Sequence, residues 1–127
     1  MRPRGVYETI VYAADLDAAR TFYRDALGLR EVEDGVFRLD DGGVLLLFDP
    51  ARSSQPGRPV PSHGSTGPVH VAFSVGDGEL AAWRERLAEQ GVEIEQEKEW
   101  SARSRSVYVR DPAGNSVELV EGDLWPR

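Results

Sequence analysis

The chain has 127 residues, 40% hydrophobic and 29% charged, without cysteine, which fits one domain with its own core and excludes disulfides, Cys-ligated metal sites and thiol nucleophiles. Its 15 Lys and Arg against 22 Asp and Glu give a formal net charge of −7, which disfavours nucleic-acid binding because that binding depends on neutralising phosphates. No apolar run reaches the roughly 18 residues of a membrane span, and no apolar signal-peptide stretch follows Met1, so we expect a cytoplasmic protein.

The first half of the chain has the pattern of a strand, a helix and three shorter strands. A strand-like run starts at Glu8 and leads to Asp15, whose side chain is placed to accept the free amides of a following helix. Apolar residues then recur near helical spacing until Gly28, a residue suited to the left-handed turn that ends a helix. Three strands are predicted after it, over residues 29–33, 35–40 and 44–49.

The second half repeats this order. His70 opens a strand that leads to Asp77, a second candidate N-cap, and the helical pattern that follows stops at Gly91. The repeat predicts an α+β fold of two βαβββ modules within one domain spanning residues 1–127, with a cupped mixed sheet. Module one is expected at about 5–50 and module two at about 68–122, with strands over 92–98, 104–110 and 116–121.

A proline-rich linker at about 51–67 separates the modules. Residues 50–68 hold five of the eight prolines, and loops of this length in small domains are connectors or functional flaps. We favour the connector, while a flap over a site between the modules remains the alternative. His63 lies in this segment, either as a spare ligand or as a solvated side chain.

In each of three predicted strands, alternation places one candidate ligand on the face that points away from the helix. Glu8, His70 and Glu118 each point away from the face that is expected to pack under a helix. Taken singly, they could be an edge charge, a core histidine and a solvated strand residue. If their faces meet, two carboxylates and one imidazole form a site without thiolate that suits a divalent metal ion: Mn²⁺, Fe²⁺, Co²⁺, Ni²⁺ or Zn²⁺. The repeat and the shared alternation favour this metal site.

Three motifs carry a resemblance to a known family. Residues 22–29 read FYRDALGL, residues 67–73 read GPVHVAF and residues 110–119 read RDPAGNSVEL. Together these segments resemble the vicinal oxygen chelate superfamily, which includes glyoxalase I, bleomycin-resistance proteins, extradiol dioxygenases and fosfomycin-modifying thiol transferases. The resemblance implies a glyoxalase-like fold whose paired modules form a cup, usually in a homodimer. It also implies a divalent metal ion that chelates two neighbouring oxygens of a small-molecule substrate.

The resemblance assigns ligand positions to this chain. Glu8 occupies the first-strand ligand position, His70 the matching position of the second module, and Glu118 the carboxylate that follows the turn at 111–115. The fourth ligand of glyoxalase I would fall within residues 44–48, which read VLLLF and offer no ligand. The three-ligand layout most resembles the fosfomycin transferases, although these usually carry histidine where this chain has Glu8.

Two classes of function are compatible with these residues. The first is a metal-dependent lyase, isomerase, transferase or dioxygenase of the superfamily, in which the metal acts as a Lewis acid. The second is a metal-free antibiotic-binding protein of the bleomycin-resistance type, which the acidic charge favours because it attracts cationic drugs. We favour the enzyme because a pure binding protein would not need three ligand-type residues. Four further residues are weaker candidates for substrate contact, because the two arginines fit solvated positions and the tryptophan could instead cap the end of the barrel: Trp100, Arg103, Arg105 and Tyr108.

Overall fold

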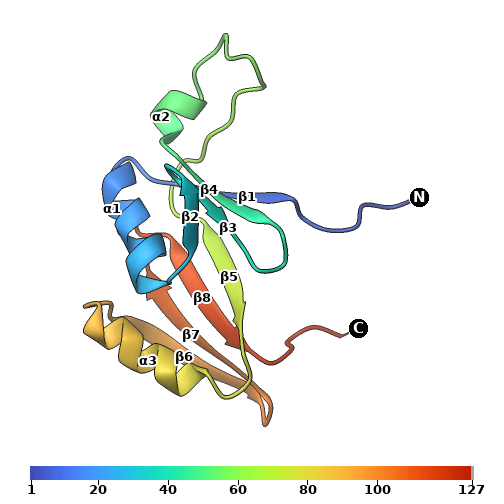
Figure 1. Cartoon of the computed structure of the whole chain (residues 1–127), viewed down its shortest axis with the longest axis vertical. Helices are drawn as coiled ribbons and strands as arrows, with labels where there is room; N and C mark the ends of the chain where they lie inside the picture. Colours follow the sequence, from blue (N-terminus) through green and yellow to red (C-terminus); the bar gives the residue numbers. More distant parts are fainter. Residues whose placement is uncertain (127) are drawn as a thin grey trace. The chain divides into compact units, whose positions relative to one another are not determined.

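The computed structural model describes residues 1–126, and these form two compact units. Unit 1 comprises residues 1–67, and unit 2 begins at Pro68. Each unit contains one four-stranded mixed sheet with a helix running beside it (Figure 1). None of the helices within residues 1–126 has the length and apolar character needed to cross a membrane.

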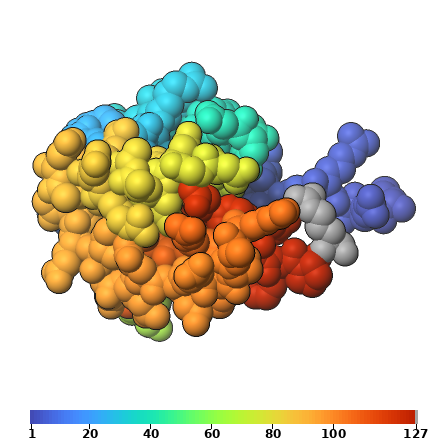
Figure 2. Space-filling model, turned by 90° about the horizontal axis from the view of Figure 1, so that it is seen from below, coloured from blue at the N-terminus to red at the C-terminus, as the bar shows by residue number. Residues whose placement is uncertain are grey.

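Unit 1 is built from β1 (Glu8–Tyr12), α1 (Leu16–Thr21), the π-helical turn η1 (Phe22–Ala26), β2 (Arg30–Glu33), β3 (Val36–Arg38), β4 (Val44–Phe48) and α2 (Pro50–Ser53). The strands lie in the order β1-β4-β3-β2, in which β1 and β4 are parallel and the other neighbours antiparallel. The first seven residues are exposed and lead into β1 (Figure 1), and Figure 2 shows the blue N-terminal end standing out from the surface.

Unit 2 is built from β5 (His70–Val75), α3 (Leu80–Glu89), β6 (Ile94–Ser101), β7 (Ser104–Arg110) and β8 (Ser116–Glu121). The strand order is β5-β8-β7-β6, again with a parallel first pair and antiparallel neighbours after it. Both units therefore have the same βαβββ topology, which confirms the predicted glyoxalase-like fold of two modules.

In unit 1 the helix covers one face of the sheet. The Asp15 side chain accepts a hydrogen bond from the Ala18 amide at 3.0 Å, as predicted for an N-cap. Gly28 has a φ of 69° and follows the helical turns, which also agrees with its expected role. The Tyr23 ring lies 6.2 Å from that of Phe37, and both side chains are fully buried, so the core of this unit lies between the helix and this face.

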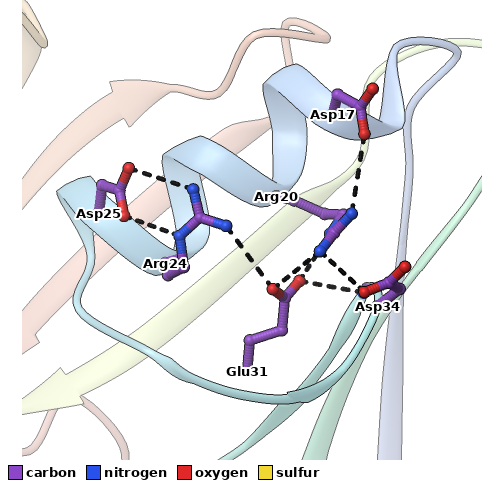
Figure 3. Close-up of polar contacts among 7 residues, drawn as sticks. Asp17, Arg20, Arg24, Asp25, Glu31 and Asp34 are labelled. Atoms are coloured by element: carbon purple, nitrogen blue, oxygen red, sulfur yellow. Dashed lines mark hydrogen bonds and ion pairs between the residues drawn. The ribbon is translucent and has the colours of Figure 1, made fainter.

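A cluster of charged side chains links α1 and η1 to Glu31 and Asp34, which lie in and just after β2 (Figure 3). Glu31 pairs with Phe37 across β2 and β3 and therefore shares the face that the helix covers. The Glu31 carboxylate accepts two hydrogen bonds from Arg20, at 2.7 and 3.1 Å, and a third from the Gly35 amide at 3.1 Å. These contacts, first of all the hydrogen bond from Arg20, lower the pKa of Glu31 to about 2.

In unit 2 the helix α3 covers the face of the sheet that carries the odd-numbered residues of β5, β7 and β8. The Leu80 amide donates to the Glu121 carboxylate at 3.3 Å, and Leu80 and Leu87 are buried. The prediction that Asp77 caps this helix is wrong: α3 starts at Leu80, and its N-cap residue is Glu79. The Glu79 carboxylate instead accepts from the Gly76 amide at 2.8 Å, which closes a turn ahead of the helix.

The turn between β7 and β8 is held by two buried polar side chains. The Asp111 carboxylate accepts from the Ala113 amide at 3.0 Å, the Asn115 amide at 2.8 Å and the Asn115 side chain at 2.9 Å. The side-chain oxygen Oδ1 of Asn115 then accepts from the Val69 amide at 3.0 Å. This turn therefore ties the start of β5 to the start of β8 and fixes the register of the two strands.

The linker sequence folds against its own unit and includes a short helix that was not predicted. Asp49 caps α2 through the Ala51 amide at 3.0 Å, and Pro50 stands at its first position, where its missing N–H costs nothing. Further along, His63 accepts or donates a 2.7 Å hydrogen bond with the Tyr12 hydroxyl, and its ring meets that of Phe48 edge-on at 4.8 Å. His63 is thus a packed residue of unit 1.

Candidate functional site

Residues that pair across neighbouring strands share a face of the sheet, so the strand register shows where each candidate ligand lies. In unit 1, Glu8 pairs with Val44 and lies on the face opposite to the one that carries Phe37. Its side chain is exposed at the start of the edge strand β1. Glu8 therefore points away from the helix, as the alternation predicted.

In unit 2, the structure brings two predicted ligands together. His70 Nε2 lies 3.2 Å from Glu118 Oε2, on the face that α3 does not cover. The Glu118 side chain is only 7% exposed, whereas that of His70 is 49% exposed. A carboxylate this deeply buried requires a compensating partner, because burial without one is costly. His70 and Glu118 are thus the centre of the candidate site.

Two serines hold these side chains in place. Ser116 Oγ lies 3.1 Å from His70 Nδ1, the ring nitrogen that faces away from Glu118. Ser106 donates a 2.5 Å hydrogen bond to Glu118 Oε1, the oxygen that does not face His70. Neither serine was predicted as a site residue. Alternation along residues 116–121 places Ser116 on the face of Glu118, whereas the position of Ser106 follows only from the register of β7 with β8.

Two of the predicted substrate-contact residues belong to this cluster. The Tyr108 ring stacks on that of His70, with centroids 6.3 Å apart and planes inclined by 27°. Burial, and then its hydrogen bond to Glu118, raise the pKa of the Tyr108 phenol above its usual value. Trp100 donates its indole N–H to Ser106 Oγ at 2.9 Å, while the rest of the side chain is half exposed.

The other two predicted contact residues lie elsewhere in unit 2. Arg103 is exposed in the turn that joins β6 to β7. Arg105 pairs with Glu121, which contacts α3, so Arg105 stands on the opposite face of the sheet from Tyr108. The structure therefore does not bring these arginines to the His70–Glu118 pair.

The donor atoms of the pair fit a shared divalent metal ion. Two donors bound to one ion at about 2.1 Å, with the angles of octahedral or tetrahedral sites, lie roughly 3.0–3.4 Å apart. The separation of 3.2 Å between His70 Nε2 and Glu118 Oε2 falls in this range. Within the described residues no group of three or more His, Cys, Asp or Glu side chains is positioned to hold a metal. The pair thus offers two donor groups, and Glu8 belongs to the other unit.

Comparisons with known proteins agree with this architecture. The family model described as "Glyoxalase/Bleomycin resistance protein/Dioxygenase superfamily" matches residues 6–119. The crystal structure of a lactoylglutathione lyase from Agrobacterium tumefaciens matches with a TM-score of 0.87 and 41% identity, covering 100% of both chains. The metallothiol transferase FosB of Bacillus licheniformis is 26% identical over 97% of this chain and 79% of its own length. MhqE of Bacillus subtilis, whose name designates a ring-cleaving dioxygenase, is 30% identical over 76% of this chain but 35% of its own, so the chain spans about a third of that relative.

Proposed function

The chain belongs to the glyoxalase/bleomycin resistance protein/dioxygenase superfamily, and from this premise we propose that it is a metal-dependent enzyme acting on a small substrate with two neighbouring oxygen atoms. The observation that carries the proposal is the His70–Glu118 pair, whose facing donor atoms lie 3.2 Å apart. A buried carboxylate opposite an imidazole is a donor set that divalent transition metals accept. Enzymes among the relatives, such as the lactoylglutathione lyase and FosB, support an enzymatic role.

We assign His70 and Glu118 to the ion as ligands, and the family resemblance implies Glu8 as the third ligand. When bound, the divalent ion would act as a Lewis acid that polarises substrate oxygens. Three protein ligands leave coordination positions free for a substrate that binds through two oxygens. Two carboxylates balance the charge of a divalent ion, so the loaded site would be close to neutral before the substrate arrives.

The surrounding side chains prepare the pair for this role. When His70 Nδ1–H donates to Ser116 Oγ, the Nε2 lone pair is left available to a metal. The stacked Tyr108 ring restricts rotation of the imidazole and, together with the half-exposed Trp100, presents an aromatic surface next to the pair. We assign substrate contact to Tyr108 and Trp100.

The ligand layout narrows the reactions to be assayed. Strand β4 has the sequence VLLLF and offers no fourth ligand, which argues for a three-ligand site. The three-ligand layout favours the reaction for which FosB is named, metallothiol transfer, and the 41% identical lactoylglutathione lyase adds its own reaction to the assays. Ring cleavage by a dioxygenase is the third.

Metal analysis of protein purified without chelators tests the proposal. We expect about one divalent ion per chain, and we expect it to be lost in His70→Ala and in Glu118→Gln. His63→Ala is the matched control, because it removes the other histidine, which contacts Tyr12 and Phe48 in unit 1. A metal-free wild-type protein that binds cationic glycopeptides would contradict the enzyme and establish the antibiotic-binding alternative, which the net charge of −7 favours.

A further inference from the structure

We propose that Trp100 and Ser106 form a directed hydrogen-bond chain that positions Glu118 for metal binding. The inference rests on the proposed function and adds two positioning residues to it. The chain runs from Trp100 Nε1 to Ser106 Oγ over 2.9 Å, and from Ser106 Oγ to Glu118 Oε1 over 2.5 Å.

The chemistry of the three groups fixes the direction of the chain. An indole N–H can only donate, so Ser106 Oγ must be its acceptor. A serine hydroxyl has one hydrogen, and an ionised carboxylate can only accept. The Ser106 proton is therefore donated to Glu118 Oε1, while Ser106 Oγ accepts from Trp100 Nε1.

The two oxygens of the Glu118 carboxylate therefore have different partners and different roles. Oε1 is held by a short, charge-assisted hydrogen bond within the sheet, whereas Oε2 faces His70 Nε2 at 3.2 Å. A carboxylate that is anchored at one oxygen does not have to lose rotational freedom when a metal binds to the other. Outer hydrogen bonds of this kind orient metal ligands and tune their basicity.

An irregularity in the pairing of β6 with β7 makes this chain of hydrogen bonds possible. Ser106 is fully buried on β7 and pairs with Lys98 on one side and Val120 on the other. The pairing of β6 with β7 is irregular between Glu99 and Ser101, so Trp100 has no partner of its own in the register. Bulges of this type redirect a side chain, and here the indole N–H reaches Ser106.

Calorimetric titration of chelator-treated protein with Mn²⁺ or Co²⁺ tests the role of Ser106. We expect Ser106→Ala to weaken metal binding by about 10–100-fold and Ser106→Thr, which keeps the hydroxyl, to restore most of the affinity. The matched control is Ser104→Ala, because Ser104 is also buried on β7 but bonds to Ser101 instead of Glu118. Ser104→Ala should bind metal like the wild type, which separates positioning from the loss of a buried hydroxyl.

Trp100 offers a second readout. Trp100→Phe keeps an aromatic ring and removes the N–H, so we expect it to weaken metal binding in the same direction as Ser106→Ala but less. Titration of the wild type with Zn²⁺, whose filled d shell does not quench by itself, should change tryptophan fluorescence. That change should be absent in Trp100→Phe, although Trp83 and Trp125 remain in the chain.

The possible results separate the two proposals. If the wild type binds about one ion and Ser106→Ala binds it with unchanged affinity, the positioning role is refuted while the proposed function stands. Equal losses in Ser104→Ala and Ser106→Ala would also refute it, because both would then reflect general damage to β7. If the wild type binds no metal, the proposed function fails and the positioning role fails with it.

Discussion

Replacing Glu31 with glutamine should destabilise the protein in a way that depends on pH. The Glu31 carboxylate has an ordinary pKa of 4.5, which the structure lowers to about 2, first through the hydrogen bond from Arg20 (Figure 3). Each pKa unit corresponds to about 1.4 kcal/mol, so the shift sets an upper limit of about 3 kcal/mol on the stabilisation. The Glu31 side chain is 13% exposed and that of Arg20 24%, and solvent screening reduces the expected value to about 1–2 kcal/mol.

The sign of the pH dependence follows from the lowered pKa. The stabilisation is complete above the unfolded-state pKa of 4.5 and is lost as the pH falls through the folded-state value of about 2. Urea unfolding of the wild type and Glu31→Gln should therefore differ by about 1–2 kcal/mol at pH 7, and the difference should shrink from about pH 5 downwards.

Glu33→Gln is the control for this prediction, because Glu33 is exposed on the same strand. It should leave the unfolding free energy nearly unchanged at every pH. A difference between the wild type and Glu31→Gln that is constant from pH 7 to pH 3 would refute the electrostatic reasoning and point to packing.

Three further predictions concern the framework of the site. Asn115→Ala removes the acceptor of the Val69 amide and one donor to Asp111, so urea unfolding should show a loss of about 2–4 kcal/mol; a loss under 1 kcal/mol would argue against this turn as the anchor of β5. Gly122→Ala places a Cβ 2.2 Å from the Arg103 carbonyl oxygen at a φ of 86°, so it should cost more than Gly42→Ala, where the φ is 92° and nothing lies within 4 Å; equal melting temperatures for the two variants would contradict this. The family resemblance predicts a homodimer, so sedimentation at micromolar concentration should give twice the 14.1 kDa chain mass, whereas a monomer would contradict it.

The sequence predicted the half of the site that depends on strand alternation. His70 and Glu118 face the same side because alternation is fixed by the backbone, and the Asp111–Asn115 turn then sets the register of β5 against β8. The motif at residues 22–29 also proved structural: Arg24 pairs with Asp25 and reaches Glu31 at 3.7 Å, while Tyr23 fills the core. This motif carries the family resemblance and builds the core and the charge cluster of unit 1.

The remainder of the site depends on contacts that no local pattern encodes. Ser106 reaches Glu118 because β7 and β8 pair in one particular register, and Trp100 reaches Ser106 because the β6–β7 pairing is irregular. The four-residue helix α2 was missed because short helices have little intrinsic stability and depend on capping, here by Asp49. The prediction of an N-cap at Asp77 is wrong because a turn closed by Glu79 shifts the start of α3 to Leu80.

If His70 and Glu118 hold a divalent metal ion, calorimetric titration of chelator-treated wild type and Glu118→Gln with Mn²⁺ will show it. Glutamine keeps the shape of the side chain and its ability to accept from Ser106, so the variant should remain folded while it loses the ligand charge. We predict about one bound ion per chain for the wild type and no measurable binding for Glu118→Gln. Equal binding by both proteins, or none by the wild type, would refute this metal site.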